Sequence, residues 1–240
     1  VAMLWFTCFF NYADRQSIFS VFKLLEEEMG LTPIQLGWVA AAFMWVYAAT
    51  GWFAGMIGDR FCRKTVILSG FMFWSVITLL FAFSTEYWHL LTLRAVEGFG
   101  EAFYFPAAMS MISSYHTKAT RSRAMGIHQS SVYVGTVAGG TLGGWMGQHY
   151  GWRSSFYVLG IGGMFLVFLL FFLLKEPPRG TIGENADSEP AGRAPESASS
   201  MFKNMIFLYK IPMIWVLTAV FIVANSVATV FLTWTPKFLG

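Results

Sequence analysis

The amino-acid sequence predicts an all-α integral membrane protein. Only 12% of its 240 residues are charged and 56% are hydrophobic, whereas about a quarter of the residues in a soluble globular domain are charged. Apolar runs of about 20 residues recur along the chain, and each is long enough to cross a hydrocarbon core of about 30 Å. Because backbone groups in lipid must form hydrogen bonds within their own segment, we expect these runs to be helices.

Seven such runs divide the chain, and basic residues cluster in two of the loops between them. The runs cover approximately residues 1–22, 36–58, 65–84, 88–113, 123–147, 153–174 and 212–235. Six basic residues lie between the second and third runs or between the fourth and fifth: Arg60, Arg63, Lys64, Lys118, Arg121 and Arg123. The opposite loops contain only Lys23 and Arg153. By the positive-inside rule, this asymmetry predicts a cytoplasmic N-terminus.

The composition changes after the sixth run. Proline, glycine, serine, alanine and acidic residues dominate 176–200, and such a segment does not bury a core, so we expect a flexible cytoplasmic linker. Residues 201–210 are amphipathic and are predicted to lie along the membrane surface as an interfacial helix. The sequence therefore predicts a six-helix bundle over 1–175, a linker over 176–210 and a seventh membrane helix over 211–240.

A weak internal repeat relates the turn after the second run to the turn after the fifth. Residues 55–64 align with 144–153 at an offset of 89, so that Gly55, Gly58 and Lys64 correspond to Gly144, Gly147 and Arg153. Two units of three helices each must insert with opposite topology, because three is odd. We therefore expect an inverted repeat; the alternative is a coincidence between glycine-rich turns.

Polar and ionisable residues inside the apolar runs are costly in a membrane and usually mark function. They gather on one face of the first helix and one face of the fourth: Asn11, Asp14, Arg15, Arg94, Glu97 and Glu101. On these two faces three acidic groups stand against two arginines, which stay charged. Burial and the crowding of carboxylates both disfavour the ionised form, so we expect the cluster to hold one proton.

This charge count leads to a hypothesis of proton coupling. Asp14 or Glu101 would carry the proton, with Arg15 and Arg94 as modulating partners. The alternative is a purely structural network of Arg94–Glu97 and Asp14–Arg15 ion pairs.

Several motifs resemble a known family, the major facilitator superfamily (MFS). Residues 55–64, Gly-Met-Ile-Gly-Asp-Arg-Phe-Cys-Arg-Lys, resemble the signature turn that joins its second and third helices. Residues 11–15, Asn-Tyr-Ala-Asp-Arg, are similar to the first helix of spinster-like transporters and of organic anion:cation symporters. Residues 94–102 and 176–180 resemble spinster-like segments. The resemblance implies the first half of a twelve-helix transporter plus the first helix of its second half, and therefore a fragment.

The resemblance also implies roles for individual residues. Asp14, Arg15 and Glu101 match positions implicated in proton-coupled cycling. The charged turn would act as a cytoplasmic gate, with Asp59 helping to latch the two halves: Gly55, Gly58, Asp59, Arg60, Arg63 and Lys64. Cys62 departs from the glycine usual in this turn.

Further polar residues are candidates for lining a substrate cavity: Asn11, His128, Gln129, Tyr133 and Asn225. Packing is an equal alternative for His128. Glycines at 135, 139, 143 and 147 recur every four residues, and small residues at this interval let helix backbones approach closely.

Together these features predict a secondary active transporter that works by alternating access, is proton-coupled, and accepts an amphiphilic, lysolipid-like solute. One alternative is a proton symporter for small carboxylates or sugar acids, and an alternative of another class is a membrane receptor or sensor. No metalloprotease motif and no cysteine–histidine pairing is evident, so we expect no catalytic residue, metal or cofactor. The expected partners are protons, membrane lipids and the missing C-terminal half, not nucleic acid, and the expected location is the plasma (inner) membrane.

Overall fold

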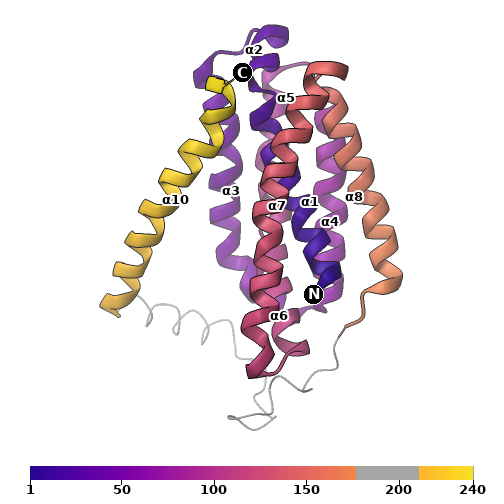
Figure 1. Cartoon of the computed structure of the whole chain (residues 1–240), viewed down its shortest axis with the longest axis vertical. Helices are drawn as coiled ribbons and strands as arrows, with labels where there is room; N and C mark the ends of the chain where they lie inside the picture. Colours follow the sequence, from indigo (N-terminus) through magenta and orange to yellow (C-terminus); the bar gives the residue numbers. More distant parts are fainter. Residues whose placement is uncertain (177–210, 240) are drawn as a thin grey trace. The chain divides into compact units, whose positions relative to one another are not determined.

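The computed structural model describes residues 1–176 and 211–239, and every element in these two ranges is helical. Side chains are described throughout these ranges except at 52, 56–60, 228, 229 and 232–239. The chain divides into two compact units, Val1–Asp187 and Ser188–Gly240. Figure 1 shows the course of the chain through the first unit, from α1 to α8. The predicted linker and interfacial helix over 177–210 lie outside the described residues.

The first three apolar runs form long helices, and a short helix lies between the first two. These helices are α1 (Ala2–Ser20), α2 (Phe22–Met29), α3 (Pro33–Arg60) and α4 (Arg63–Phe81). α2 was not predicted. It buries Phe22 and Leu25 against the bundle and ends at Gly30, whose φ of 64° suits glycine at a helix C-terminus.

The next three runs form α5 (Tyr87–Glu101), α6 (Tyr104–Tyr115), α7 (Lys118–Tyr150) and α8 (Arg153–Leu173). The expectation of one continuous helix over 88–113 is wrong, because α5 ends at Glu101 and α6 begins at Tyr104. The physical reason is Pro106. It has no N–H to donate to the carbonyl of Ala102, and its ring clashes with that carbonyl, although proline is tolerated in the first turn of the new helix.

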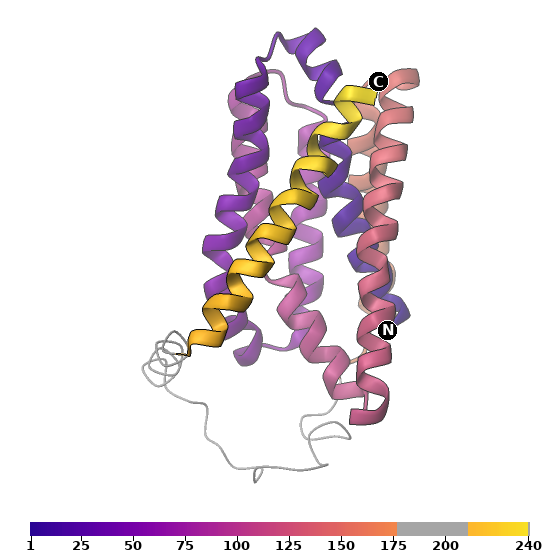
Figure 2. The ribbon, with the colours of Figure 1, turned by 60° about the vertical axis from the view of Figure 1, so that its left-hand side comes forward.

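Pairing of the helices follows the predicted repeat. The most extensive interfaces in residues 1–176 are α1 with α7, α3 with α5 and α4 with α8. One repeat consists of α1, α3 and α4, and the other of α5/α6, α7 and α8. The first helix of each repeat packs against the second helix of the other repeat, and the two third helices pack against each other. Figures 1 and 2 show that α1 and α5 run in opposite directions. The arrangement is that of two inverted three-helix repeats.

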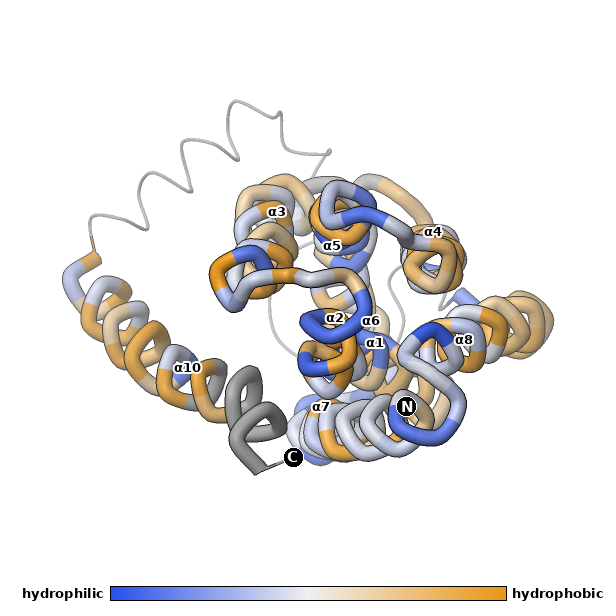
Figure 3. The backbone as a smooth tube through the Cα atoms, turned by 90° about the horizontal axis from the view of Figure 1, so that it is seen from above, coloured by the Kyte–Doolittle hydropathy of each residue, from blue (hydrophilic) through white to orange (hydrophobic). Residues whose placement is uncertain are grey.

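Glycines on α7 set the position of α1. Gly135, Gly139 and Gly143 are buried, and a Cβ added at Gly135 would lie 2.6 Å from the carbonyl oxygen of Phe9 on α1. The two backbones are therefore almost in contact, as the four-residue spacing predicted. Viewed along the helices, α1 lies near the middle of the bundle (Figure 3), where it also contacts α4 and α8.

The second unit contributes α10 (Pro212–Leu239), at the place of the predicted seventh helix. By length and composition, three described helical segments can cross a membrane: Pro33–Gly51, Arg63–Phe81 and Arg153–Leu173. Pro212–Val227 is a shorter apolar segment. α1 is less apolar than these three segments because its second half carries Asn11, Asp14, Arg15 and Gln16.

Candidate functional site

Three buried carboxyl groups meet between α1 and α5. One oxygen each of Asp14, Glu97 and Glu101 can be chosen so that all lie within 4.8 Å of one another. The exposed fraction of each residue is 4% or less. α1 supplies Asp14 from its packed middle section. α5 supplies the two glutamates one turn apart, and the helix ends at the second of them because of the break before Pro106.

Each glutamate is bonded by an arginine. The Arg15 Nη2 and Nε atoms lie 2.6 and 3.3 Å from Glu101 Oε2. Arg94 Nη1 lies 2.6 Å from Glu97 Oε2, and Arg94 Nη2 donates to the backbone carbonyl of Arg15 at 3.0 Å. The Arg94–Glu97 pair of the structural alternative is therefore present. The Asp14–Arg15 pair is not what the structure describes, because adjacent residues on a helix point in different directions and Arg15 reaches across to α5.

Asp14 instead contacts a hydroxyl on α4. Its Oδ2 atom is hydrogen-bonded to Thr78 Oγ1, which also lies 2.9 Å from the carbonyl oxygen of Trp74. Thr78 is 1% exposed. Thr78 was not among the predicted site residues, because α4 carries other hydroxyl side chains and the sequence does not distinguish which of them faces α1.

Aromatic rings surround the two guanidinium groups. The guanidinium carbon of Arg15 lies 4.6–4.9 Å from the ring centres of Phe43, Tyr12 and Tyr47. That of Arg94 lies 4.6 Å from the Phe43 ring, so both guanidiniums contact Phe43. Cation–π contacts of this kind stabilise a cation removed from water. Phe43 and Tyr47 were also not among the predicted site residues, since aromatic residues are common in any apolar run.

The charge and hydrogen-bond balance of the cluster is incomplete. Within the part of the chain that the structure describes, Glu97 Oε1, Glu101 Oε1 and Asn11 Nδ2 are buried without a hydrogen-bond partner. Three carboxyl groups face two guanidiniums. Carboxylate oxygens are ligands for hard cations, but one oxygen of each glutamate is already bonded to an arginine.

The side chains proposed for a substrate cavity differ in their exposure. His128 is completely buried, and its Nε2 atom lies 2.9 Å from Tyr104 Oη. It therefore packs inside the bundle and does not face an open space. Gln129 and Tyr133 are exposed on α7, and Asn225, exposed on α10, donates to the Phe221 carbonyl of its own helix at 2.9 Å. Asn11 is buried beside the carboxyl cluster on α1.

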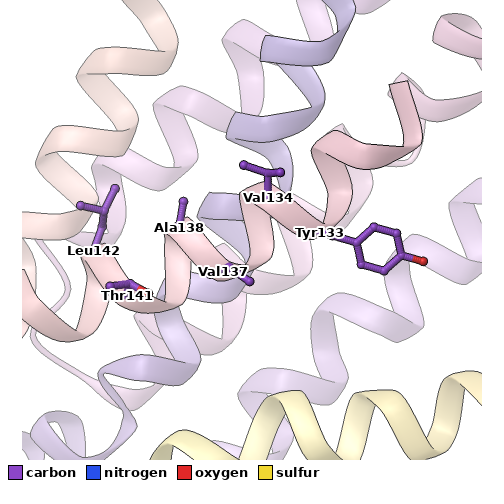
Figure 4. A pocket seen from close by; sticks show the side chains of 6 residues that line it. All are labelled: Tyr133, Val134, Val137, Ala138, Thr141 and Leu142. Atoms are coloured by element: carbon purple, nitrogen blue, oxygen red, sulfur yellow. The ribbon is translucent and has the colours of Figure 1, made fainter. Parts of the chain in front are cut away.

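An apolar hollow lies on α7, with a volume of about 620 Å³ (Figure 4). Its lining residues span almost three turns of the helix: Tyr133, Val134, Val137, Ala138, Thr141 and Leu142. Tyr133 is the one predicted cavity residue among them.

The predicted gate turn lies at the junction of α3 and α4. Gly55 and Gly58 are in α3, whereas the side chains of Asp59 and Arg60 are outside the described part of the structure. Arg63 Nη1 donates to Ser114 Oγ at 2.5 Å, and Lys64 Nζ donates to the Phe171 carbonyl at 2.8 Å.

Glu176, which follows α8 in the sequence, binds the same turn. Its carboxylate accepts hydrogen bonds from the backbone N–H groups of Arg63, at 3.2 Å, and Lys64, at 2.7 Å. These are first-turn N–H groups of α4, which have no partner within the helix. Glu176 therefore acts as an N-terminal cap supplied by a residue more than 100 positions away in the sequence.

Comparison with known proteins identifies related transporters. The chain is 30% identical over 256 residues to the probable galactarate/D-glucarate transporter GudP of Bacillus subtilis (strain 168), covering 100% of this chain and 56% of that protein. It is 29% identical over 246 residues to protein spinster homolog 1 of Homo sapiens, covering 100% of this chain and 45% of the relative. The chain thus spans about half the length of the curated relatives it matches.

A solved structure shares the fold. The crystal structure of a bacterial homolog to the human lysosomal transporter spinster, inward-facing and unoccupied, superposes with a TM-score of 0.80 and 25% sequence identity. The match covers 99% of this chain and 54% of that one. The sequence model of the Major Facilitator Superfamily matches residues 4–240. The predicted fold class and the predicted family resemblance are both confirmed, and the chain belongs to the Major Facilitator Superfamily.

Proposed function

We propose that the full-length protein is a proton-coupled secondary active transporter that works by alternating access. The observation that carries this proposal is the buried cluster of three carboxyl groups and two guanidiniums. With both ion pairs formed, one acidic group, Asp14, has no cation bonded to it among the described residues. A buried carboxyl group without a cation strongly favours the neutral, protonated form. A group that must hold a proton when buried and can release it when water reaches it is what coupling requires.

Three parts of the chain would have different roles in the full-length protein. Residues 1–175 would form one half of the transporter, 176–210 the cytoplasmic linker, and 211–240 the beginning of the second half. The two halves would rock around a site near the membrane midplane, as in other transporters built from inverted repeats. The turn at 55–64 would gate the cytoplasmic side. The bias of basic residues supports a cytoplasmic N-terminus in the plasma (inner) membrane.

For the substrate we propose an amphiphilic, lysolipid-like molecule. The apolar hollow on α7 supports this choice because it offers an acyl chain a surface without charged groups. The similarity to a spinster homolog in both sequence and structure also supports it.

A second candidate is a small organic anion. The side chain of Arg15 is 13% exposed, whereas that of Glu101, its partner, is fully buried. Arg15 could therefore contact a carboxylate on its open side while keeping its bond to Glu101. The names of other relatives, a sulfoacetate transporter and a D-galactonate transporter, favour such a substrate.

The test uses the full-length protein in proteoliposomes under an imposed pH gradient. Internal pH is recorded while lysophospholipids, and then sugar acids, are added. We expect proton flux with one substrate class, and we expect Asp14→Asn and Glu101→Gln each to abolish it without loss of membrane insertion. Glu27→Gln removes the same charge from the exposed face of α2 and should leave the flux unchanged.

The outcomes separate the candidates. Arg15→Gln should weaken transport of an organic anion strongly and transport of a lysolipid much less. If both carboxyl variants keep the wild-type pH dependence, proton coupling through this cluster is refuted. Absence of flux with either class in correctly inserted protein would favour a receptor or sensor.

A further inference from the structure

Thr78 makes two hydrogen-bonding contacts with a single hydroxyl hydrogen. Its Oγ1 atom is bonded to Asp14 Oδ2 on α1 and also lies 2.9 Å from the carbonyl oxygen of Trp74, one turn earlier on α4. The residue is 1% exposed, and Asp14 is 4% exposed. Both contacts are therefore made without bulk water.

Counting hydrogens decides how the contacts are made. A threonine hydroxyl has one hydrogen to donate and two lone pairs, and a carbonyl oxygen can only accept. The contact with Trp74 therefore uses the Thr78 hydrogen. An ionised carboxylate also only accepts, so with Asp14 ionised the two acceptors must share the single Thr78 hydrogen. A protonated Asp14 brings a second hydrogen, which it can donate to Thr78. All contacts are satisfied when Asp14 donates to Thr78 and Thr78 donates to Trp74.

We propose that Thr78 is a positioning residue for the proton on Asp14, an inference that rests on the proposed proton coupling. It holds the protonated carboxyl group by accepting its hydrogen. When Asp14 loses the proton, the hydroxyl rotates, donates to the carboxylate and leaves the Trp74 carbonyl. The protonation state of Asp14 on α1 is thereby linked to the hydrogen bonding of the Trp74 carbonyl on α4.

The surroundings of Asp14 leave this role to Thr78. The charged groups that face Asp14 are Glu97, Glu101 and Arg94 on α5, and both glutamates are bonded to arginines. α7 meets the backbone of Ala13, next to Asp14, through Gly139. α8 meets the ring of Phe10, one turn earlier on α1, through Gly162. Among the described residues, the hydroxyl of Thr78 is the hydrogen-bonding group that α4 directs at Asp14.

The test is infrared difference spectroscopy of the full-length protein in lipid, between acidic and alkaline pH. We expect a C=O stretching band of a protonated carboxyl group that Asp14→Asn removes. Thr78→Val keeps the shape of the side chain but removes the acceptor, so the band should shift to higher wavenumber. Thr78→Ser keeps the hydroxyl and should restore the wild-type position. Thr136→Val is the matched control, because Thr136 donates to the Val132 carbonyl of its own helix at 2.7 Å.

Two results would overturn the proposal: a band that Thr78→Val does not move, or the absence of any band that Asp14→Asn removes. If Thr78→Val does not fold, Thr78→Ala removes the same group and is judged by the same band. In the proton-flux assay, Thr78→Val should slow transport about two- to tenfold, the effect of one hydrogen bond, with rescue by Thr78→Ser. If wild-type protein shows no flux but the band behaves as expected, the proposed transport function fails and the role of Thr78 at Asp14 stands.

Discussion

The close approach of α1 to α7 allows a sharp prediction for Gly139→Ala. A Cβ at Gly139 on α7 would overlap the carbonyl oxygen of Ala13 and lie 2.5 Å from its Cα and 2.6 Å from its carbonyl carbon. All three obstacles are backbone atoms of α1, next to Asp14, so no side-chain rotation can relieve the overlap. The two helices must move apart.

The neighbouring Gly140 provides the control. A Cβ there would lie 3.6 Å from Gln16 Cγ and 3.7 Å from Ser20 Oγ, which is ordinary van der Waals contact. Both substitutions gain the same helix propensity, about 0.8–1 kcal/mol in water, so that gain cancels in the comparison. The remaining difference is the cost of overpacking, typically about 1–3 kcal/mol. We expect the upper part of that range because backbone must shift.

The assay is reversible unfolding of the full-length protein in mixed micelles with increasing denaturing detergent, followed by circular dichroism. Gly140→Ala should be as stable as wild type or slightly more stable. Gly139→Ala should be less stable than Gly140→Ala by about 2–3 kcal/mol. Equal stability of the two variants would refute the argument that glycine at 139 is required for the approach of α1 to α7.

Two further variants test contacts outside the carboxyl cluster. Glu176→Ala removes the cap of α4 and should reduce stability by about 0.5–2 kcal/mol, measured as a lower thermal unfolding midpoint, whereas Glu27→Ala on the exposed face of α2 should not. Tyr104→Phe removes the bond from Tyr104 Oη to the Leu4 carbonyl, at 2.7 Å, and the contact with His128. It should cost about 1–3 kcal/mol in the same assay and leave proton flux intact; loss of flux with stability unchanged would contradict the packing role of His128.

The sequence predicted most of the fold because hydropathy and charge report directly on the membrane environment. Apolar runs located the helices, and the glycine spacing on α7 located a close helix contact. The two errors are local. α2 is too short to appear as a membrane run, and the break at Ala102 depends on a single residue, Pro106, inside a run whose hydropathy is continuous.

The partners within the candidate site were less predictable than its members. Shared helix faces placed Asn11, Asp14 and Arg15 on α1, but a shared face does not say which neighbouring helix each side chain meets. In the structure Arg15 bonds Glu101, and Asp14 bonds Thr78 on a different helix. The Glu176 cap has the same character, because it joins segments more than 100 residues apart.

By itself, the sequence determined the class of protein, most of the helix positions, the repeat, and the excess of acidic over basic groups in the set Asp14, Arg15, Arg94, Glu97 and Glu101. These properties follow from composition and periodicity, because the hydropathy of each segment by itself decides whether it can cross a membrane. Only the tertiary structure decided which carboxyl groups are paired with arginine and which one is left to a hydroxyl. The pairing of each carboxyl group depends on how closely α1 approaches α7 and on the rotation of each helix about its axis. Both are fixed by packing between segments that are distant in the chain.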